Sequence, residues 1–244
     1  MPRFFVEGDQ IADGVIYIEG DDVRHIARAL RMAVGDGVTV CDGEGTVYEC
    51  ELTRIRDEQC ECRVVTSSAV KTESPIEITL YMAFPKGDKL ETVIQKAVEL
   101  GASCIVPFES SRCIKRPKAD KIDKQTCRYT RIAHEAAKQC GRACLPTVSE
   151  PVGFKEMLDL AGEADAVLFC YEGEGTVSLR KYLESIEAPR TMAVIVGSEG
   201  GFSEEEARAC CERGFISVNL GPRILRCETA PSYVLSNVSY RFEL

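Results

Sequence analysis

Three glycine-rich stretches near the C-terminus combine the residue types and the spacing expected of a ligand-binding site. Each follows an apolar run that is typical of a buried strand, and they comprise residues 171–175 (YEGEG), 197–201 (GSEGG) and 220–226 (LGPRILR). Glycine has no side chain, so such loops let the main chain approach a ligand closely. One such loop alone is better explained as a tight turn between a strand and a helix. Three of them favour a shared pocket, because ligands bind beyond the carboxyl ends of the strands in open parallel sheets.

The acidic side chains in these loops narrow the class of ligand. None of the loops matches the dinucleotide-binding pattern GxGxxG or the phosphate-binding pattern GxxxxGK[ST]. Glu172, Glu174 and Glu199 would repel a pyrophosphate, whereas they tolerate a ligand that carries a sulfonium and an ammonium group. S-adenosylmethionine fits this description best. The alternative is that the three carboxylates only point to solvent.

The elements that must position these loops alternate between strand and helix. We expect strands at 76–84, 104–108, 166–171, 192–196 and 216–220, and helices at 88–100, 178–185 and 203–213. Ser203 and Glu206 have the spacing of a capping box, and Pro231 suits the first turn of a final helix. Such alternation predicts an α/β domain with a parallel sheet and helices on both faces.

The N-terminal part has a different pattern of expected secondary structure. Short strand-like runs at 3–6, 15–18, 38–41, 47–55 and 60–65 are separated by Gly-Asp and Asp-Gly turns and predict a small β-barrel. A helix is expected at 21–31, with Val23, Ile26, Ala27 and Leu30 on its apolar face and Arg24, Arg28 and Arg31 on the opposite face. Residues 67–75, rich in Ser, Thr and Pro, read as a linker. We therefore expect two domains, 1–70 and 75–244.

Positive charge is concentrated in one region of an acidic chain. The net charge is −9, and residues 1–70 carry seven Lys and Arg against fourteen Asp and Glu, whereas residues 112–142 carry ten against three. A long helix is expected at 121–140, and one of its faces presents Lys124, Arg128, Arg131, Lys138 and, one turn further, Arg142, interrupted by Glu135. A charged face is usually only solvated, but this one, in a chain with a glycine-rich pocket, favours contact with a polyanion.

Composition sets the remaining limits. A hydrophobic fraction of 45% and a charged fraction of 28% are ordinary for a globular protein. No apolar run reaches the roughly 20 residues of a membrane span, and no signal-peptide core is present, so we expect a cytoplasmic protein without a membrane partner. The thirteen cysteines include no CxxC pair and only two histidines accompany them, which predicts reduced thiols and no metal site.

Several ordered motifs resemble those of one family. They are KAVELGA and IVPF at 96–108, EAAKQCGR at 135–142, IVGSEGGFSEEE at 195–206 and LGPRILRCETA at 220–230, and HIARALR at 25–31 resembles the same family's N-terminal barrel. The chain is similar, over nearly its whole length, to the RsmE family of 16S ribosomal RNA uridine-N3 methyltransferases in the SPOUT superfamily. The resemblance implies a PUA-like barrel followed by a parallel sheet whose C-terminal segment threads a trefoil knot. It also implies a homodimer that acts on small-subunit ribosomal RNA or the 30S particle.

The resemblance assigns roles to residues of this chain. It implies that the knot loops hold S-adenosylmethionine, with S-adenosylhomocysteine as product, through Tyr171, Glu172, Gly173, Val196, Gly197, Ser198, Glu199, Gly200, Gly201, Leu220, Gly221, Pro222, Ile224 and Leu225. Gln139 and Arg142 would approach the RNA or the reacting base. Three residues differ from the family's usual pattern, namely Ser198 for proline, Cys227 for threonine, and Pro231 within an alanine-rich stretch.

The expected reaction is methyl transfer to N3 of a uridine, achieved mainly by positioning and by donors to the uracil oxygens. Arg142, Arg223 and Arg226 are the candidates for orienting RNA or stabilising the uracil anion. Arginine is a poor proton acceptor and neither histidine lies in the loops, so the sequence identifies no clear general base, and Glu228 is only a weak candidate for one. RNA would contact Lys124, Arg128, Arg131 and Lys138, and also Arg24, Arg28 and Arg31, although a solvated helix face explains these last three arginines equally well. A SPOUT transfer-RNA ribose 2′-O-methyltransferase is one alternative, although it would not predict the N-terminal barrel. A non-catalytic RNA-binding protein is another, although it would not explain the three loops.

Overall fold

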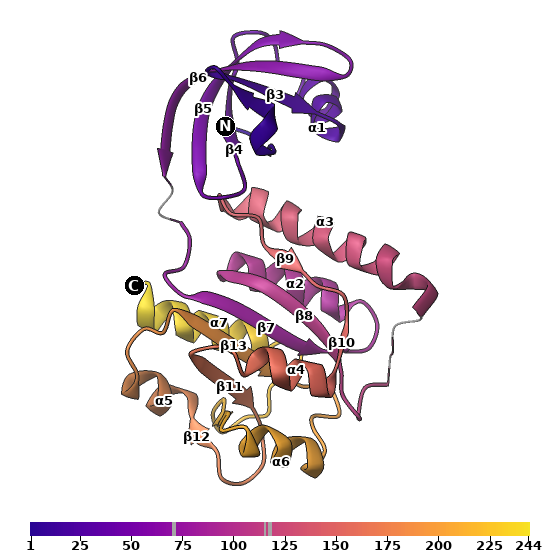
Figure 1. Cartoon of the computed structure of the whole chain (residues 1–244), viewed down its shortest axis with the longest axis vertical. Coiled ribbons are helices and arrows are strands. Elements are labelled where there is room, and N and C mark those ends of the chain that lie inside the picture. Colours follow the sequence, from indigo (N-terminus) through magenta and orange to yellow (C-terminus); the bar gives the residue numbers. More distant parts are fainter. Residues whose placement is uncertain (70–71, 115, 117–118) are drawn as a thin grey trace. The chain divides into compact units, whose positions relative to one another are not determined.

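A computed structural model describes residues 1–69, 72–114, 116 and 119–244. The chain divides into two compact units, one made of Met1–Glu73 and Ala137–Leu145, the other of Ser74–Ala136 and Pro146–Leu244. Most elements of the two units are labelled in Figure 1. The first unit is therefore assembled from two separate stretches of chain. Nothing in the local sequence pattern predicted that residues 137–145 would join it.

The first unit is built on a six-stranded sheet in the order β1-β4-β5-β6-β3-β2. Its strands are β1 (Arg3–Phe5), β2 (Ile11–Ala12), β3 (Val15–Glu19), β4 (Gly37–Cys41), β5 (Thr46–Ile55) and β6 (Gln59–Ala69), with a short η1 helix (Gly8–Gln10) before β2. All neighbouring strands pair antiparallel except β1 and β4. One apolar core draws side chains from five of the six strands, including Phe4, Ile18, Val40, Leu52 and Cys62. A sheet with one shared core agrees with the predicted PUA-like barrel.

Strand β6 is longer than the sequence predicted. It continues to Ala69, which pairs with Thr46, so residues 67–69 are strand and not linker as we expected. The polar residues at this end are exposed, and β-pairing through the main chain does not require an apolar side chain. Residues 70 and 71 of the predicted linker lie outside the described residues.

The helix expected at 21–31 is only partly regular. Helix α1 (Asp21–Arg24) passes into a π-helical turn, η2 (His25–Ala29), closed by the Leu30 N–H donating to the His25 carbonyl at 2.9 Å. A π-turn holds more residues than an α-turn, so it rotates the side chains that come after it to a different face. Val23 and Ile26 are buried as predicted, but Ala27 and Leu30 are exposed, so the predicted apolar face is wrong beyond Ile26.

The stretch 137–145 is held to the rest of the first unit by a buried ion pair. The Arg142 guanidinium, 7% exposed, lies 2.8 Å from the Glu73 carboxylate through Nη2 and 2.9 Å through Nε. The other Glu73 oxygen accepts from the main-chain N–H groups of Ala143 (2.9 Å) and Cys144 (3.2 Å). Leu145 N–H donates to the Gly43 carbonyl at 3.1 Å. Glu73 thus closes the turn at the end of the long helix.

The second unit contains a parallel sheet in the order β10-β8-β7-β13-β11-β14-β12, with β9 beside β8. Its strands are β7 (Glu77–Ala83), β8 (Ala102–Glu109), β9 (Thr147–Val148), β10 (Val152–Gly153), β11 (Ala166–Cys170), β12 (Val177–Ser178), β13 (Thr191–Val196) and β14 (Ile216–Asn219). Every pairing in this sheet is parallel. The predicted α/β class and parallel sheet are confirmed, and the short strands β9, β10 and β12 were not predicted.

Helices cover both faces of this sheet, as the alternation predicted. They are α2 (Lys89–Glu99), α4 (Phe154–Ala161), α5 (Leu179–Ser185), α6 (Glu204–Glu212) and α7 (Ala230–Phe242). Helix α7 contacts α2, α5 and β13 on one face, while α4 and α6 lie on the other (Figure 1). The long helix α3 (Ile122–Cys140), preceded by the η3 turn (Ala119–Lys121), begins in the second unit and ends in the first. Helix α4 was missed, because its buried set is limited to Met157, Leu158 and Ala161.

Candidate functional site

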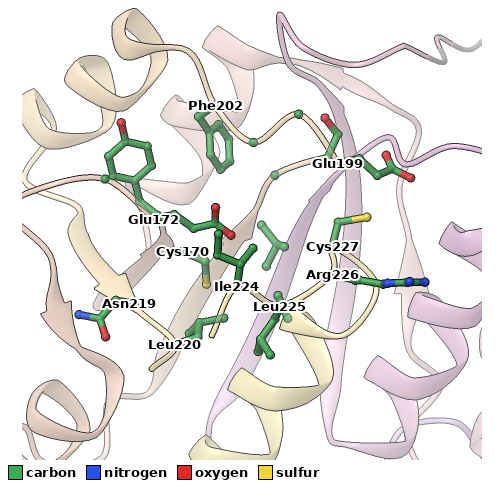
Figure 2. Close-up of a pocket in the computed structure, with 18 of the residues that line it drawn as sticks. Cys170, Glu172, Glu199, Phe202, Asn219, Leu220, Ile224, Leu225, Arg226 and Cys227 are labelled. Atoms are coloured by element: carbon green, nitrogen blue, oxygen red, sulfur yellow. The ribbon is translucent and has the colours of Figure 1, made fainter. Parts of the chain in front are cut away.

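The three glycine-rich loops line one pocket of about 860 Å³. They follow β11, β13 and β14, and β11 lies between the other two, so the carboxyl ends of three adjacent parallel strands meet at this place. All fourteen residues predicted to hold the cofactor line it, together with Arg223, Arg226 and Glu228. Figure 2 shows side chains from all three loops around the hollow. The prediction that the loops share one pocket agrees with this geometry.

Two of the glycines make room for neighbouring protein atoms. A Cβ atom on Gly200 would lie 3.0 Å from Cβ of Arg112, and one on Gly197 would lie 2.9 Å from the ring of Phe202. Gly201 differs, because its φ of 62° is left-handed and nothing lies within 4 Å of an added Cβ. Its N–H donates to the Ser198 carbonyl at 2.9 Å, which closes the turn. We expected these glycines to admit a ligand. Gly197 and Gly200 do line the pocket, but a side chain at either position is also excluded by the close packing of Phe202 and Arg112.

The loop after β8 supports the 197–202 loop from one side. The Arg112 guanidinium donates to the Gly200 carbonyl at 3.0 Å, and the Ser198 hydroxyl donates to the Arg112 carbonyl at 3.4 Å. Ser198 is 6% exposed, so its hydroxyl uses a nearby acceptor instead of water. The serine that replaces the family's proline therefore has a partner in this structure.

The predicted capping box at the start of α6 is confirmed, and it has a second function. The Ser203 hydroxyl accepts from Glu206 N–H, and the Glu206 carboxylate accepts from Ser203 N–H at 2.9 Å. The same carboxylate, on a residue only 7% exposed, also accepts from Ser111 N–H at 2.7 Å and from the Ser111 hydroxyl at 2.9 Å. Glu206 thus joins α6 to the loop that carries Arg112.

Stacked aromatic rings form the floor beneath the loops. Phe202 packs edge-on against Phe169 with ring centroids 4.7 Å apart and stacks on Phe108 at 6.3 Å. Tyr171 stacks on Phe169 at 5.3 Å, and its ring leaves no space for a side chain on Gly173. Such contacts are rigid, so the starts of the 171–175 and 197–202 loops are held by the core.

Positive and negative groups are paired at one side of the pocket. The Lys89 ammonium lies 2.9 Å from the Glu199 carboxylate and 3.1 Å from that of Glu228. Burial is the largest influence on the pKa of Glu199 and raises it, but hydrogen bonds from Lys89 and from main-chain N–H groups together lower it below its usual value. The hydrogen bonds to Glu199 and Glu228 also raise the pKa of Lys89. Glu199 is therefore already paired with a cation, and the Glu172 carboxylate remains the loop carboxylate suited to a cationic ligand.

The predicted proton acceptor, Glu228, is held in its charged form. A hydrogen bond from its own main-chain N–H is the largest cause that lowers the pKa of Glu228; partial burial opposes it, and Lys89 adds to it. The Cys227 thiol donates to the same carboxylate at 3.3 Å. Burial raises the pKa of Cys227 and of Cys170, the two thiols that line the pocket, to about 12. Neither thiol is ionised at neutral pH.

The other predicted catalytic residues separate into two groups. Arg223 and Arg226 line the pocket, and in Figure 2 Arg226 extends away from Ile224 and Leu225. Gln139 and Arg142 belong to the first unit, where Gln139 is exposed and the Arg142 guanidinium is buried against Glu73. The function of these residues stays a prediction.

The predicted RNA-binding cations differ in how accessible they are. Lys124, Arg131, Arg28 and Arg31 are exposed. Arg24 pairs with Asp21, and Arg128 lies 2.9 Å from the Glu91 carboxylate within the second unit. Lys138, only 22% exposed, lies 3.0 Å from the Asp22 carboxylate within the first unit. The α3 face is therefore partly neutralised by acidic neighbours.

The pocket is also lined by eight residues that the sequence did not single out as ligand contacts: Lys89, Arg112, Cys170, Phe202, Glu204, Asn219, Cys227 and Ala230. Four of these, Cys170, Phe202, Asn219 and Cys227, flank the predicted loops directly in sequence, and Glu204 and Ala230 follow a few residues later. Lys89 and Arg112 instead follow β7 and β8, strands on the β13 side of the sheet. Applying the strand-end rule to these two strands as well would have indicated their loops.

Neither a metal-binding cluster nor a membrane-spanning helix occurs in the described part of the chain. Over residues 1–69, 72–114, 116 and 119–244, no three or more His, Cys, Asp or Glu side chains are grouped so that they could hold a metal ion. Within the same residues, no helix is both long enough and apolar enough to cross a membrane.

Two family models match the chain and agree with its two kinds of sheet. The model described as an RNA methyltransferase domain matches residues 72–239, and the model described as an RNA methyltransferase PUA domain matches residues 18–65. The first match covers the parallel sheet and the whole pocket. Fold and site thus have the character of an RNA methyltransferase.

Curated relatives and solved structures narrow this class. Ribosomal RNA small subunit methyltransferase E from Bacillus subtilis is 35% identical over 251 residues, covering 100% of this chain and 98% of the relative. The protein of the same name from Synechocystis is 31% identical, covering 99% of this chain and 78% of the relative. A crystal structure of ribosomal RNA small subunit methyltransferase E from Neisseria gonorrhoeae bound to S-adenosyl methionine has a TM-score of 0.86 at 30% identity, covering 98% and 97% of the two chains. This chain therefore belongs to the family of ribosomal RNA small subunit methyltransferases E, as its motifs predicted.

Proposed function

We propose that this protein transfers the methyl group of S-adenosylmethionine to N3 of a uridine in small-subunit ribosomal RNA. The observation that carries the proposal is the pocket at the ends of β11, β13 and β14, in a chain whose relatives over its full length are methyltransferases of that RNA. The choice of N3 rests on the sequence motifs of the RsmE family.

The residues of the pocket suit S-adenosylmethionine. A volume of about 860 Å³ lies in the range of small-molecule sites. Val196, Ile224 and Leu225 supply apolar surface, and Glu172 supplies a carboxylate for a sulfonium or an ammonium group. The turn at Gly201 has open space beside it, where a ligand can lie against bare main chain. When bound, the cofactor supplies an electrophilic methyl group.

The protein's own contribution is to hold the base and the charge that develops on it. Arg223 and Arg226, at the pocket, can donate to uracil oxygens or to a neighbouring phosphate. Glu228 is a weak proton acceptor because its pKa is lowered. We infer that stabilisation of the uracil anion by arginine contributes more to the reaction than strong general-base catalysis. Gln139 remains a candidate RNA contact from the first unit.

Methylation of small subunits with labelled cofactor, followed by nucleoside analysis, tests the proposal. Label in 3-methyluridine is expected. Label in a 2′-O-methylated nucleoside would support the ribose methyltransferase instead, and calorimetry that detects no binding of S-adenosylmethionine to the folded protein would support a non-catalytic RNA-binding protein.

We also propose that the protein is a homodimer and that its C-terminal segment is knotted. Tyr233 and Tyr240, seven residues apart on α7, are 42% and 75% exposed, so one face of this helix offers two aromatic side chains to a second copy. Light scattering after chromatography tests the dimer, and Tyr240→Asp is expected to favour the monomer. The knot rests on the motifs that resemble the SPOUT superfamily, and it is compatible with the position of β11 between β13 and β14 and with the packing of α7 on β13. An experimental trace of residues 220–244 that passes outside the 171–196 segment would contradict it.

A cytoplasmic location remains a prediction, which cell fractionation can check.

A further inference from the structure

Lys89, the first residue of α2, lies where two of the cofactor loops meet. Its ammonium lies 2.9 Å from the Glu199 carboxylate and 3.1 Å from the Glu228 carboxylate. The side chains are 35%, 28% and 23% exposed, so the cluster is half-buried at the pocket. Figure 2 shows Glu199 and Cys227, the neighbour of Glu228, on the same side of the hollow. A single ammonium group is shared by two acidic side chains.

The two carboxylates come from loops that the sheet does not join directly. Glu199 follows β13 and Glu228 follows β14, and β11 lies between these strands. No ladder of main-chain hydrogen bonds therefore sets the distance between the two loops. The 197–202 loop is also held by Arg112 and by Phe202, whereas residues 221–224 of the other loop are all exposed.

The contacts of the two acidic residues are unequal. The Glu199 carboxylate also accepts from the Lys86 main-chain N–H, at 3.1 and 3.2 Å, so it is fixed to the start of α2 independently of Lys89. The Glu228 carboxylate pairs with the Lys89 ammonium and accepts from the adjacent Cys227 thiol. Without the ammonium, two carboxylates would face each other with like charge, and the more weakly held loop would move away.

We propose that Lys89 is a positioning residue of the cofactor pocket, which holds the 220–228 loop against the 197–202 loop through its bonds to Glu228 and Glu199. The proposal rests on the proposed function, because it takes the pocket to be the S-adenosylmethionine site. Lys89 acts through the two loops, so its contribution is to the affinity for the cofactor and not to the chemical step.

Calorimetry with S-adenosylmethionine, on the full chain, tests the proposal with Lys89→Gln and Lys89→Arg. We expect Lys89→Gln to weaken binding about tenfold, because charge-assisted hydrogen bonds to both loops are lost. Lys89→Arg should recover most of the affinity, since a guanidinium can bridge two carboxylates. At saturating cofactor the bound ligand itself holds the 220–228 loop, and with it Arg223 and Arg226, so kcat should change less than roughly twofold; a fall in kcat as large as the fall in affinity would contradict the proposal.

Lys96 offers a matched control on the same helix. Its ammonium lies 2.8 Å from the Glu99 carboxylate, on an exposed surface outside the pocket. Lys96→Gln removes the same charge from α2, and we expect no change in cofactor affinity. Equal loss of affinity in the two variants would overturn the proposal, because net charge alone would then explain it.

A double-mutant cycle separates positioning from direct contact with the ligand. In a Glu199→Gln, Glu228→Gln background the like-charge repulsion is absent, so Lys89→Gln should have almost no further effect. A full additional loss in that background would show that Lys89 contacts the cofactor itself and would refute the positioning function. If wild type binds cofactor and Lys89→Gln binds it equally well, the inference alone fails. If wild type does not bind, the proposed function fails with it.

Discussion

Glu206 offers the sharpest test of how the pocket is supported. Its carboxylate is 7% exposed and accepts three hydrogen bonds, one from Ser203 N–H and two from Ser111. These bonds connect the start of α6 with the loop after β8, and the next residue of that loop, Arg112, holds the Gly200 carbonyl. Damage at Glu206 should therefore reach the pocket.

Glu206→Gln keeps the shape and removes one acceptor. In one orientation the new NH₂ group faces the Ser111 N–H, and in the other it faces the Ser203 N–H, so one buried donor is opposed by another donor either way. Only the Ser111 hydroxyl can rotate to accept. An unsatisfied buried N–H costs about 1–3 kcal/mol, and loss of charge at a helix N-terminus adds about 0.3–1 kcal/mol. We expect destabilisation of about 2 kcal/mol, equivalent to a fall in Tm of about 4–8 °C for a chain of this size.

Glu205→Gln is the control, because Glu205 is exposed in the same first turn of α6. It removes the charge near the helix terminus without disturbing the contact with Ser111, so Tm should fall by only about 1–3 °C. The measurement is thermal unfolding of both variants and of wild type, together with calorimetry of cofactor binding. Equal Tm values for the two variants would refute the reasoning, since the buried hydrogen bonds would then contribute nothing.

Three further outcomes are expected. Gly200→Ala should weaken binding of S-adenosylmethionine about tenfold, because the new methyl group overpacks against Arg112. Gly214→Ala, at a φ of 78° with open space around it, should leave the affinity measured by calorimetry unchanged. Equal affinities for the two variants would contradict this. The pKa of Glu199 lies below its usual 4.5. The contribution of the charged Glu199 carboxylate to cofactor affinity, through its ion pair with Lys89, is therefore complete above that pH and is lost as the pH falls through the lowered pKa. Cofactor affinity should thus be flat from about pH 6 to 8 and decline only below about pH 4.5; a decline already near neutral pH would count against it. Because Cys170 and Cys227 have pKa values raised to about 12, iodoacetamide should label exposed cysteines in the native protein and spare these two, as peptide mass spectrometry can show; rapid labelling of either would disprove the assignment.

The parts of the fold that could be predicted are those with local signals. The capping box of Ser203 and Glu206 and the glycines after β11, β13 and β14 are short-range patterns, and the strand-end rule brought them together correctly. The π-turn at His25–Ala29 could not be read in this way, because its apolar residues have helical spacing up to the point where the turn widens.

The parts of the site that the sequence did not reveal depend on contacts between distant stretches of the chain. Lys89 and Arg112 reach the pocket from the loops after β7 and β8, and neither lies in a motif that resembles a binding site. Their positions follow from strand order, in which β7 lies beside β13. Likewise, the burial of Arg142 depends on Glu73, which is distant in sequence. Residue type and periodicity do not report such pairings.

The divided first unit has a consequence for synthesis of the protein. Met1–Glu73 emerges from the ribosome first. At that stage its strands still lack Ala143, which packs with Cys41 and Val47, and Glu73 still lacks its partner Arg142. Before Ala137–Leu145 can emerge, β7, α2, β8 and most of α3 must be synthesised. The N-terminal unit therefore cannot finish folding as an independent early product, and its completion is delayed until more than half of the chain has been translated.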